Sequence, residues 1–158
     1  TKITGKFPQE INFERGSVGA VCLSHILHFL SPDELDFAFE KFSRWLTPGG
    51  KVFVVTYSPY IACFQHFLPI YKKRYKRGVK WPCWVENNVH DYLEAPPDVL
   101  ANLPDTMNYL ELAPLTQAFE ENGFSIERAE YLDPVKNNIP EGLVLDGQEW
   151  SGVIAVKK

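Results

Sequence analysis

Short apolar runs alternate with amphipathic segments along much of the chain. Residues 18–24 form a nearly all-apolar run after a Gly-Ser turn, and residues 51–57 form a second run of β-branched and aromatic side chains. Runs of this length and type are typical of strands that are buried on both faces of a parallel sheet. Residues 2–7 also fit a short edge strand.

A helix is predicted between the two apolar runs. Ser31 can cap it, Pro32 suits the first helical position, and Glu34 completes a capping box. Residues 47–50, Thr-Pro-Gly-Gly, end the helix, because proline cannot continue it and glycine allows positive φ. Strand, helix and strand then form a βαβ unit with a right-handed crossover. The apolar face of the helix is predicted to consist of Leu35, Ala38, Phe39, Phe42 and Leu46.

Residues 59–107 interrupt this rhythm. Their first part has apolar residues at helical spacing, with a kink expected at Pro69 and a stop at Gly78. The rest carries two tryptophans, four prolines and little periodicity. We therefore expect an irregular insertion on the substrate side of the domain, such as a lid or binding loop.

The α/β pattern returns near residue 113. A helix with Pro114 in its first turn should end at Asn122-Gly123, and the alternation over residues 124–132 predicts a half-buried strand. Residues 151–156 give a final short strand. The sequence thus predicts one α/β domain over residues 1–158, with residues 59–107 as its insertion.

Composition narrows the classes of protein. The chain is 45% hydrophobic and 23% charged, with a net charge of -4, which argues against a disordered or strongly nucleic-acid-binding chain. It has no apolar run near the ~18 residues that a membrane span needs, and no signal peptide is visible. Its three scattered cysteines, Cys22, Cys63 and Cys83, fit a reducing compartment and form no zinc pattern. A cytoplasmic protein without a metal site is expected.

Three segments together resemble one known family. They are residues 22–30 (CLSHILHFL), residues 31–55 with the turn LTPGG before an apolar strand, and residues 112–132 with the pattern L-x-x-x-F-x-x-x-G-F. In this order and spacing they are similar to the C-terminal part of class I S-adenosylmethionine-dependent methyltransferases. The resemblance covers about residues 5–58 and 108–157. It implies a partial Rossmann-like sheet with helices on its faces and a long insertion after the second clear strand.

The chain also departs from the family pattern. The glycine-rich cofactor loop is absent, since the ten glycines contain no G-x-G-x-G, and the acidic residue that would hold the ribose has no counterpart. Lys6 and Gly19 stand where the family often has aspartate. We therefore expect the C-terminal part of such a domain, either truncated or degenerate and inactive on its own. Its open sheet edge should be covered by a partner chain or a second copy.

The resemblance implies that S-adenosylmethionine is the cofactor and lies beside Phe7, Leu23, Ser24 and His25. The carboxyl end of an open α/β sheet is also where ligands bind. His28 is a candidate catalytic acid or base. The alternative is that His25 is an exposed loop residue and that His28 is a hydrogen-bonded residue at the start of the next helix.

Four aromatic residues are candidates for the binding site of a small-molecule acceptor: Tyr57, Tyr60, Trp81 and Trp84. The tyrosines end the second strand, and the alternative for them is packing against the next helix. The tryptophans lie in the insertion, and the alternative for them is to anchor a long loop.

Residues 71–80 concentrate six of the 16 basic residues, interleaved with two tyrosines. Such a run could contact nucleic acid or an anionic membrane, or it could stabilise the carboxyl end of a helix. Motifs for hydrolysis, phosphate loops and metal ligation are absent from the sequence. Two functions remain open: methyl transfer to a small-molecule acceptor, and a non-catalytic methyltransferase-like binding or regulatory module.

Overall fold

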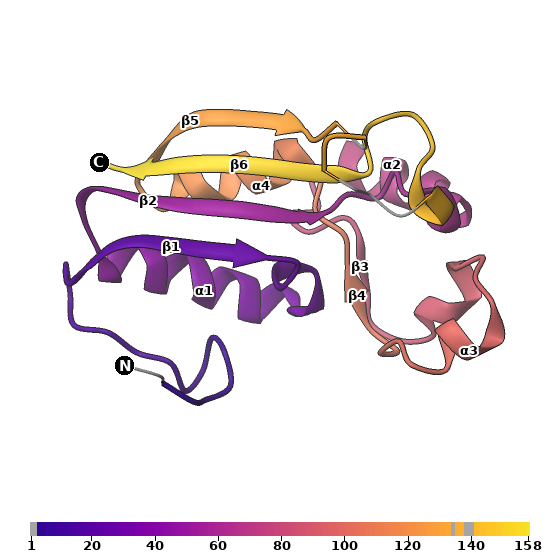
Figure 1. Ribbon diagram of the computed structural model, residues 1–158, viewed down its shortest axis with the longest axis horizontal. Coiled ribbons are helices and arrows are strands. Elements are labelled where there is room, and N and C mark those ends of the chain that lie inside the picture. The colour runs from indigo at the N-terminus through magenta and orange to yellow at the C-terminus, as the bar shows by residue number, and fades with distance from the viewer. Residues whose placement is uncertain (1–2, 134, 138–140) are drawn as a thin grey trace.

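A four-stranded mixed sheet forms the centre of the protein (Figure 1). The computed structural model describes residues 3–133, 135–137 and 141–158. The first two strands are parallel, and the last strand of the chain pairs antiparallel with both of its neighbours. In spatial order, the strands are β1 (Val18–Ser24), β2 (Leu46–Tyr57), β6 (Trp150–Lys157) and β5 (Phe124–Tyr131). This is the partial Rossmann-like α/β sheet that the sequence predicts.

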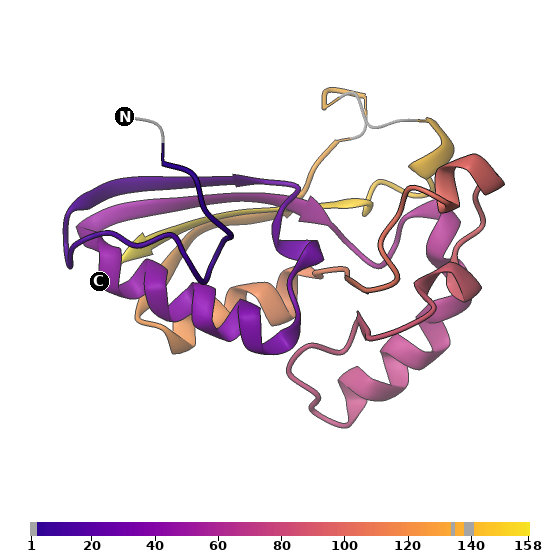
Figure 2. The ribbon, with the colours of Figure 1, turned by 90° about the horizontal axis from the view of Figure 1, so that it is seen from below.

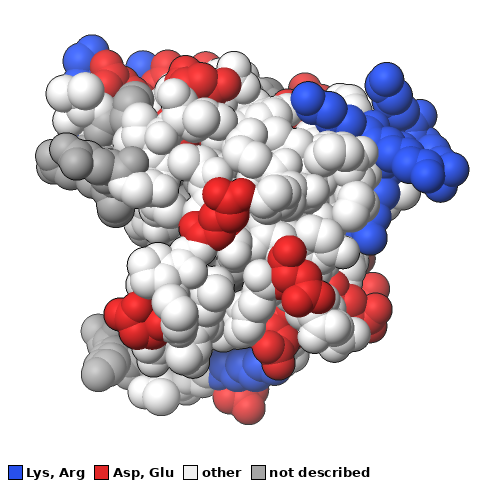
Figure 3. Space-filling model, turned by 90° about the vertical axis from the view of Figure 1, so that its right-hand side faces the viewer, with Lys and Arg blue, Asp and Glu red and all other residues white. Residues whose placement is uncertain are grey.

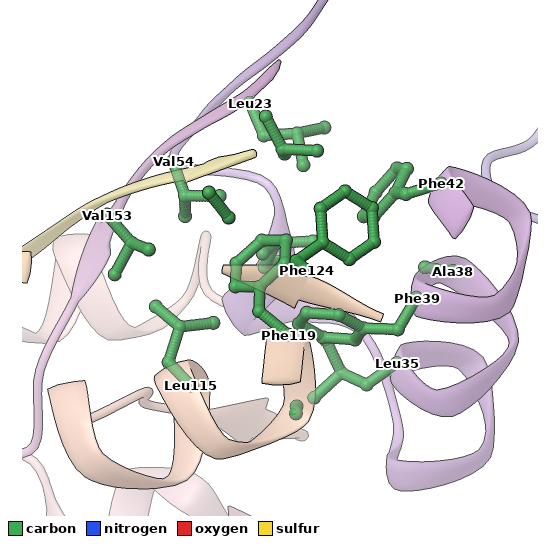
Figure 4. Packing of buried hydrophobic residues seen from close by; sticks show 14 of the residues in the cluster. Leu23, Leu35, Ala38, Phe39, Phe42, Val54, Leu115, Phe119, Phe124 and Val153 are labelled. Carbon is green, nitrogen blue, oxygen red and sulfur yellow. The ribbon is translucent and has the colours of Figure 1, made fainter. Parts of the chain in front are cut away.

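Two helices, α1 (Pro32–Trp45) and α4 (Leu112–Glu121), cover the same face of this sheet (Figure 2). Phe39 of α1 and Phe119 of α4 meet edge to face with ring centroids 4.7 Å apart. Their neighbours on the helices and strands point into one core beneath the sheet (Figure 4). In the described part of the chain no helix covers the opposite face, and Phe53 there keeps 38% of its surface exposed.

The start of α1 follows the predicted capping box. Ser31 Oγ accepts the Glu34 N–H at 3.3 Å, and Glu34 Oε2 accepts the Ser31 N–H at 3.0 Å. Both caps satisfy backbone donors that the first helical turn leaves free. The predicted apolar face is buried in the core.

The Pro-Gly-Gly turn brings the end of α1 back against β1. Gly49 has a φ of +78°, which an L side chain adopts only with strain. A Cβ on Gly50 would lie 2.9 Å from the Thr47 carbonyl oxygen and 3.0 Å from the Gly19 carbonyl oxygen. The second glycine is therefore needed for a close approach between two backbone segments.

Two strand predictions are wrong in detail. Lys2 lies outside the described residues, and residues 3–7 form no strand. The segment instead runs to the helix side of the sheet, where Lys41 of α1 donates hydrogen bonds to the carbonyls of Pro8 (2.6 Å) and Ile11 (2.7 Å).

The second error is shared by both apolar runs: β2 alternates between buried and less buried residues, with Phe53 exposed, and β1 is not buried on both faces either. Only Leu23 among its side chains is buried. In the described structure, β1 lies at the edge of the sheet and has a strand on one side only. No helix covers one of its two faces, so the side chains on that face stay accessible to solvent.

The insertion builds a second hydrophobic cluster of its own. Its first helical segment ends near Gly78, as predicted, where φ is +73°. The cluster packs aromatic and aliphatic side chains that include Phe64, Phe67 and Tyr109. The elements of the insertion are η2 (Ala62–Phe67), α2 (Leu68–Lys76), β3 (Trp84–Val85), η3 (Val89–Tyr92), α3 (Pro97–Leu100) and β4 (Met107–Asn108).

Two short 3-10 turns complete the described structure, η1 (Leu27–Phe29) after β1 and η4 (Glu141–Leu143) before β6. None of the helices in the described ranges is long and apolar enough to cross a membrane.

Replacing Gly50 by alanine should lower the free energy of unfolding by about 1–3 kcal/mol, because the new methyl group presses on two backbone oxygens that cannot move independently. Urea unfolding measures the effect. Gly19→Ala is the matched control, since a Cβ there meets no atom within 4 Å. Equal stability of the two variants would contradict the close approach.

Candidate functional site

The carboxyl ends of β1 and β2 meet at one edge of the sheet, since the strands are parallel and Ser24 pairs with Val55. Aromatic rings gather there from three elements. The His25 ring centroid lies 4.8 Å from that of Tyr57 and 4.5 Å from that of Trp150. The His28 ring lies 4.9 Å from Tyr57 on another side. We call these four residues the aromatic cluster.

Buried polar groups concentrate around the aromatic cluster. Apart from Lys41, the buried polar side chains of the described residues come from this end of the sheet or from β4 beside it. Buried side-chain atoms that lack a hydrogen-bond partner, among the described residues, also lie at this end of the sheet or in β4. Native proteins rarely leave such groups unpaired except where a ligand, water or function accounts for them. The unpaired atoms are His25 Nδ1, Asn108 Oδ1 and Nδ2, Glu149 Oε2, Trp150 Nε1 and Ser151 Oγ.

His25 has an unusual backbone conformation. Its φ is 51°, in the left-handed region that residues other than glycine rarely adopt, and its N–H donates to the Val55 carbonyl at 2.8 Å. Outliers of this kind are held by their surroundings and are frequent at functional sites. Partial burial lowers the pKa of His25.

His28 is almost completely buried, with 1% of its surface exposed. Its Nδ1 lies 3.2 Å from Thr56 Oγ1. Burial, helped by the nearby charge of His25, lowers the pKa of His28 from 6.5 to about 3. The imidazole is therefore neutral at pH 7 and is a hydrogen-bonding group of low basicity.

A pocket of about 470 Å³ lies between this end of the sheet and the insertion. His28 and Tyr57 contribute to its wall from the sheet side. Apolar residues of the insertion make up most of the remainder, and Glu94 is the acidic residue in the lining. Within the described ranges, neither lysine nor arginine lines the pocket, which therefore favours a neutral, largely apolar ligand.

The residues predicted to bind the cofactor lie in different surroundings. Ser24 is exposed and His25 half-buried, both at the carboxyl end of β1. The Leu23 side chain packs in the core, so only the main chain of Leu23 is available to a ligand at the end of β1. Phe7 stacks on Phe42 of α1, with ring centroids 5.9 Å apart.

Of the four residues predicted to bind the acceptor, Tyr57 lines the pocket. Tyr60 does not line the pocket. Its hydroxyl instead donates a hydrogen bond to Glu111 Oε1 at 3.3 Å. The same carboxylate accepts hydrogen bonds from Tyr71 and Tyr131. Glu111 thus ties the insertion to α4 and β5.

The two tryptophans of the insertion lie in a separate groove beside α1. Trp81 is buried against Phe39, and its Nε1 donates to Asp36 Oδ1 at 3.0 Å. These contacts match the alternative that Trp81 anchors the insertion. Trp84 lines the same groove and begins β3, which pairs antiparallel with β4.

Sequence reasoning missed Trp150 and Tyr109. Trp150 precedes the predicted last strand by one residue, and extending the alternation of β6 backwards would have placed it on the same face as Ile154. Tyr109 lines the pocket from just after the insertion, where the sequence carries no periodic signal. In the ranges described, no group of three or more His, Cys, Asp or Glu side chains could hold a metal ion.

Comparison with known proteins gives a consistent result. Residues 5–54 match a family described as a methyltransferase domain. Among curated proteins, none matches the sequence. Many solved structures share the fold.

Three of these structures illustrate the likeness. S-adenosylmethionine-dependent methyltransferases from Mesorhizobium loti and Methanosarcina mazei superpose with TM-scores of 0.58 and 0.56 at 16% and 17% identity, each over 94% of this chain. They are matched over 65% and 63% of their own lengths. A Burkholderia thailandensis 1,6-didemethyltoxoflavin-N1-methyltransferase gives 0.56 at 10% identity, over 94% of this chain and 47% of its own.

The chain thus spans about 65% of the length of such structures. The strand order, the position of the Pro-Gly-Gly turn and the match over residues 5–54 agree with one another. This chain therefore has the fold of the class I S-adenosylmethionine-dependent methyltransferases.

Proposed function

We propose that the chain forms the acceptor side of an S-adenosylmethionine-dependent methyltransferase that modifies a small, largely apolar molecule. The observation that carries this proposal is the apolar pocket of about 470 Å³ at the carboxyl ends of β1 and β2. In open α/β sheets this is the edge where ligands bind. The Burkholderia thailandensis enzyme of the same fold was solved with a small-molecule substrate and S-adenosylhomocysteine.

The described residues fit one part of the cofactor. His25 carries an unpaired buried Nδ1, Ser24 is exposed beside it, and the rings of Tyr57 and Trp150 lie close by. Aromatic faces suit a cation, and S-adenosylmethionine supplies its methyl group from a positively charged sulfur. For the ribose and the carboxylate the chain offers no glycine-rich loop. The fit is therefore limited to the methyl-donor side.

Positioning would supply most of the catalysis. Holding two reactants in line can contribute up to ~7–11 kcal/mol to lowering a barrier. The apolar lining would hold the acceptor and exclude water. His28, fixed by Thr56, would orient the acceptor as a neutral group rather than take its proton, because its pKa lies far below neutral pH.

The competing function is a non-catalytic methyltransferase-like binding or regulatory module. Lys6 supports it, because this residue pairs with Glu34 at 3.6 Å at a position where the family often has an acid.

Isothermal titration calorimetry with S-adenosylhomocysteine distinguishes the two functions. We expect binding by a form of the chain extended at its N-terminus, and weak or no binding by the 158-residue chain. Binding by the extended form alone would exclude a degenerate module. If neither form binds, the proposed enzyme function is wrong.

The neutral state of His28 makes stability depend on pH. In the unfolded chain His28 is protonated below about pH 6.5, its ordinary pKa, whereas in the folded chain it stays neutral until the pH falls to about 3. His28 therefore lowers the free energy of unfolding as the pH falls, by roughly 1.4 kcal/mol per pH unit in this window.

His28→Gln should remove this contribution and flatten the curve between pH 6 and pH 4, as measured by urea unfolding at several pH values. Leu27→Met controls for disturbed packing, since Leu27 is the fully buried neighbour. It should shift the curve without changing its slope. A His28→Gln slope equal to that of the unmodified chain would contradict a buried neutral imidazole.

We also propose that a second polypeptide segment covers the outer edge of β1. In the described structure β1 pairs with β2 alone, and Cys22 beside this edge is exposed. An unpaired strand edge is a ready template for further pairing.

Light scattering after size exclusion tests this pairing. The 158-residue chain should elute with a mass of at least twice its 18.1 kDa, because a second copy is the available partner in a pure sample. If an N-terminally extended form is monomeric, the edge is covered within one polypeptide. A monodisperse monomer of the 158-residue chain would contradict the proposal.

A further inference from the structure

The outer side of α2 carries four exposed cations, Lys72, Lys73, Lys76 and Arg77, which we call the basic face. They gather in one corner of the surface in Figure 3. Lys72 lies four residues before Lys76, and Lys73 lies four before Arg77, so like charges are neighbours on the helix surface.

Lys73 and Lys76 lie in the last turn of α2, where positive charge suits the helix dipole, but the basic face takes no part in the ion pairs of the described fold. None of its four cations has a described carboxylate within 4.0 Å. The neighbouring basic residues differ: Arg74 donates to the Trp84 carbonyl at 2.6 Å, and Lys80 pairs with Asp36 at 3.0 Å. Like charges at this spacing destabilise a helix. In a chain of net charge -4, this local excess of positive charge indicates an anionic partner.

We propose that the basic face docks the protein onto an anionic lipid surface. Tyr75 (47% exposed) and Val79 (45%) lie beside the cations. Lysine and arginine next to tyrosine and aliphatic side chains are typical of peripheral membrane contacts.

The apolar pocket and the basic face are both built partly from the insertion. Ile61 and Cys63, which line the pocket, lead directly into α2, and Val99 of α3 lines it with 45% of its surface exposed. Both α2 and α3 lie at the end of the molecule that Figure 3 faces. An apolar ligand for such a pocket would be concentrated in a bilayer. The docking surface itself does not depend on methyl transfer.

Two observations favour lipid over nucleic acid. Strand-binding surfaces stack successive bases on several aromatic rings, and of the two tyrosines in α2 only Tyr75 is exposed. Acidic side chains are scattered over the rest of this side of the molecule, with smaller basic groups at its upper left and lower edges (Figure 3). They would repel a long polyanion, whereas a flat anionic surface needs to reach only the protruding corner.

Vesicle co-sedimentation tests the proposal with the 158-residue chain. We expect binding to phosphatidylcholine vesicles that contain phosphatidylglycerol, little binding to pure phosphatidylcholine, and release by high salt. Each neutralised cation should weaken binding about fivefold, the equivalent of ~1 kcal/mol. The test variant replaces all four cations of the basic face by glutamine.

A matched variant removes the same charge elsewhere, at the exposed residues Lys6, Arg15, Lys136 and Lys158. It should retain most of the binding. Thermal melting checks that both variants fold. Equal losses in both variants, equal binding to neutral vesicles, or tighter binding of a single-stranded oligonucleotide than of anionic vesicles would each overturn the proposal.

Discussion

The pairing of β2 determines where the candidate site lies. Its parallel partner β1 places two carboxyl strand ends at one edge, and its antiparallel partner β6 places Trp150 opposite Tyr57. The Tyr57 carbonyl also accepts the Leu110 N–H at 2.8 Å, which fixes the end of the insertion against the sheet. One strand end therefore lies between the two hydrophobic clusters, and the pocket is lined by residues of the second cluster together with His28 and Tyr57.

Polarity is distributed unevenly along this sheet. The α1–α4 side is a dry core of aromatic and aliphatic residues, whereas the end around the aromatic cluster retains buried polar atoms that the described chain leaves unpaired. Burial keeps His28 neutral in these surroundings. Such a site suits chemistry that depends on orientation and a desolvated acceptor more than on proton transfer.

Local signals predicted the fold well. The capping box of α1 and the Pro-Gly-Gly turn are encoded within a few residues, and the structure reproduces both. Burial of β1 was not predictable in this way, because it depends on elements that pair with its edge or cover its face. In the site, Tyr57 followed from the strand-end rule, but Tyr109 reaches the pocket only through the fold of the insertion. The separate groove of Trp81 and Trp84 likewise depends on tertiary packing against α1.

The four tryptophans offer a direct test of the central claim, that the aromatic cluster is a ligand site. The indole N–H resonances of an N-terminally extended chain can be followed by NMR as S-adenosylhomocysteine is added. The account predicts that the Trp150 resonance shifts, because its ring lies 4.5 Å from His25, while Trp81 in its separate groove stays unchanged. A shift of Trp81 with an unchanged Trp150 would contradict the account.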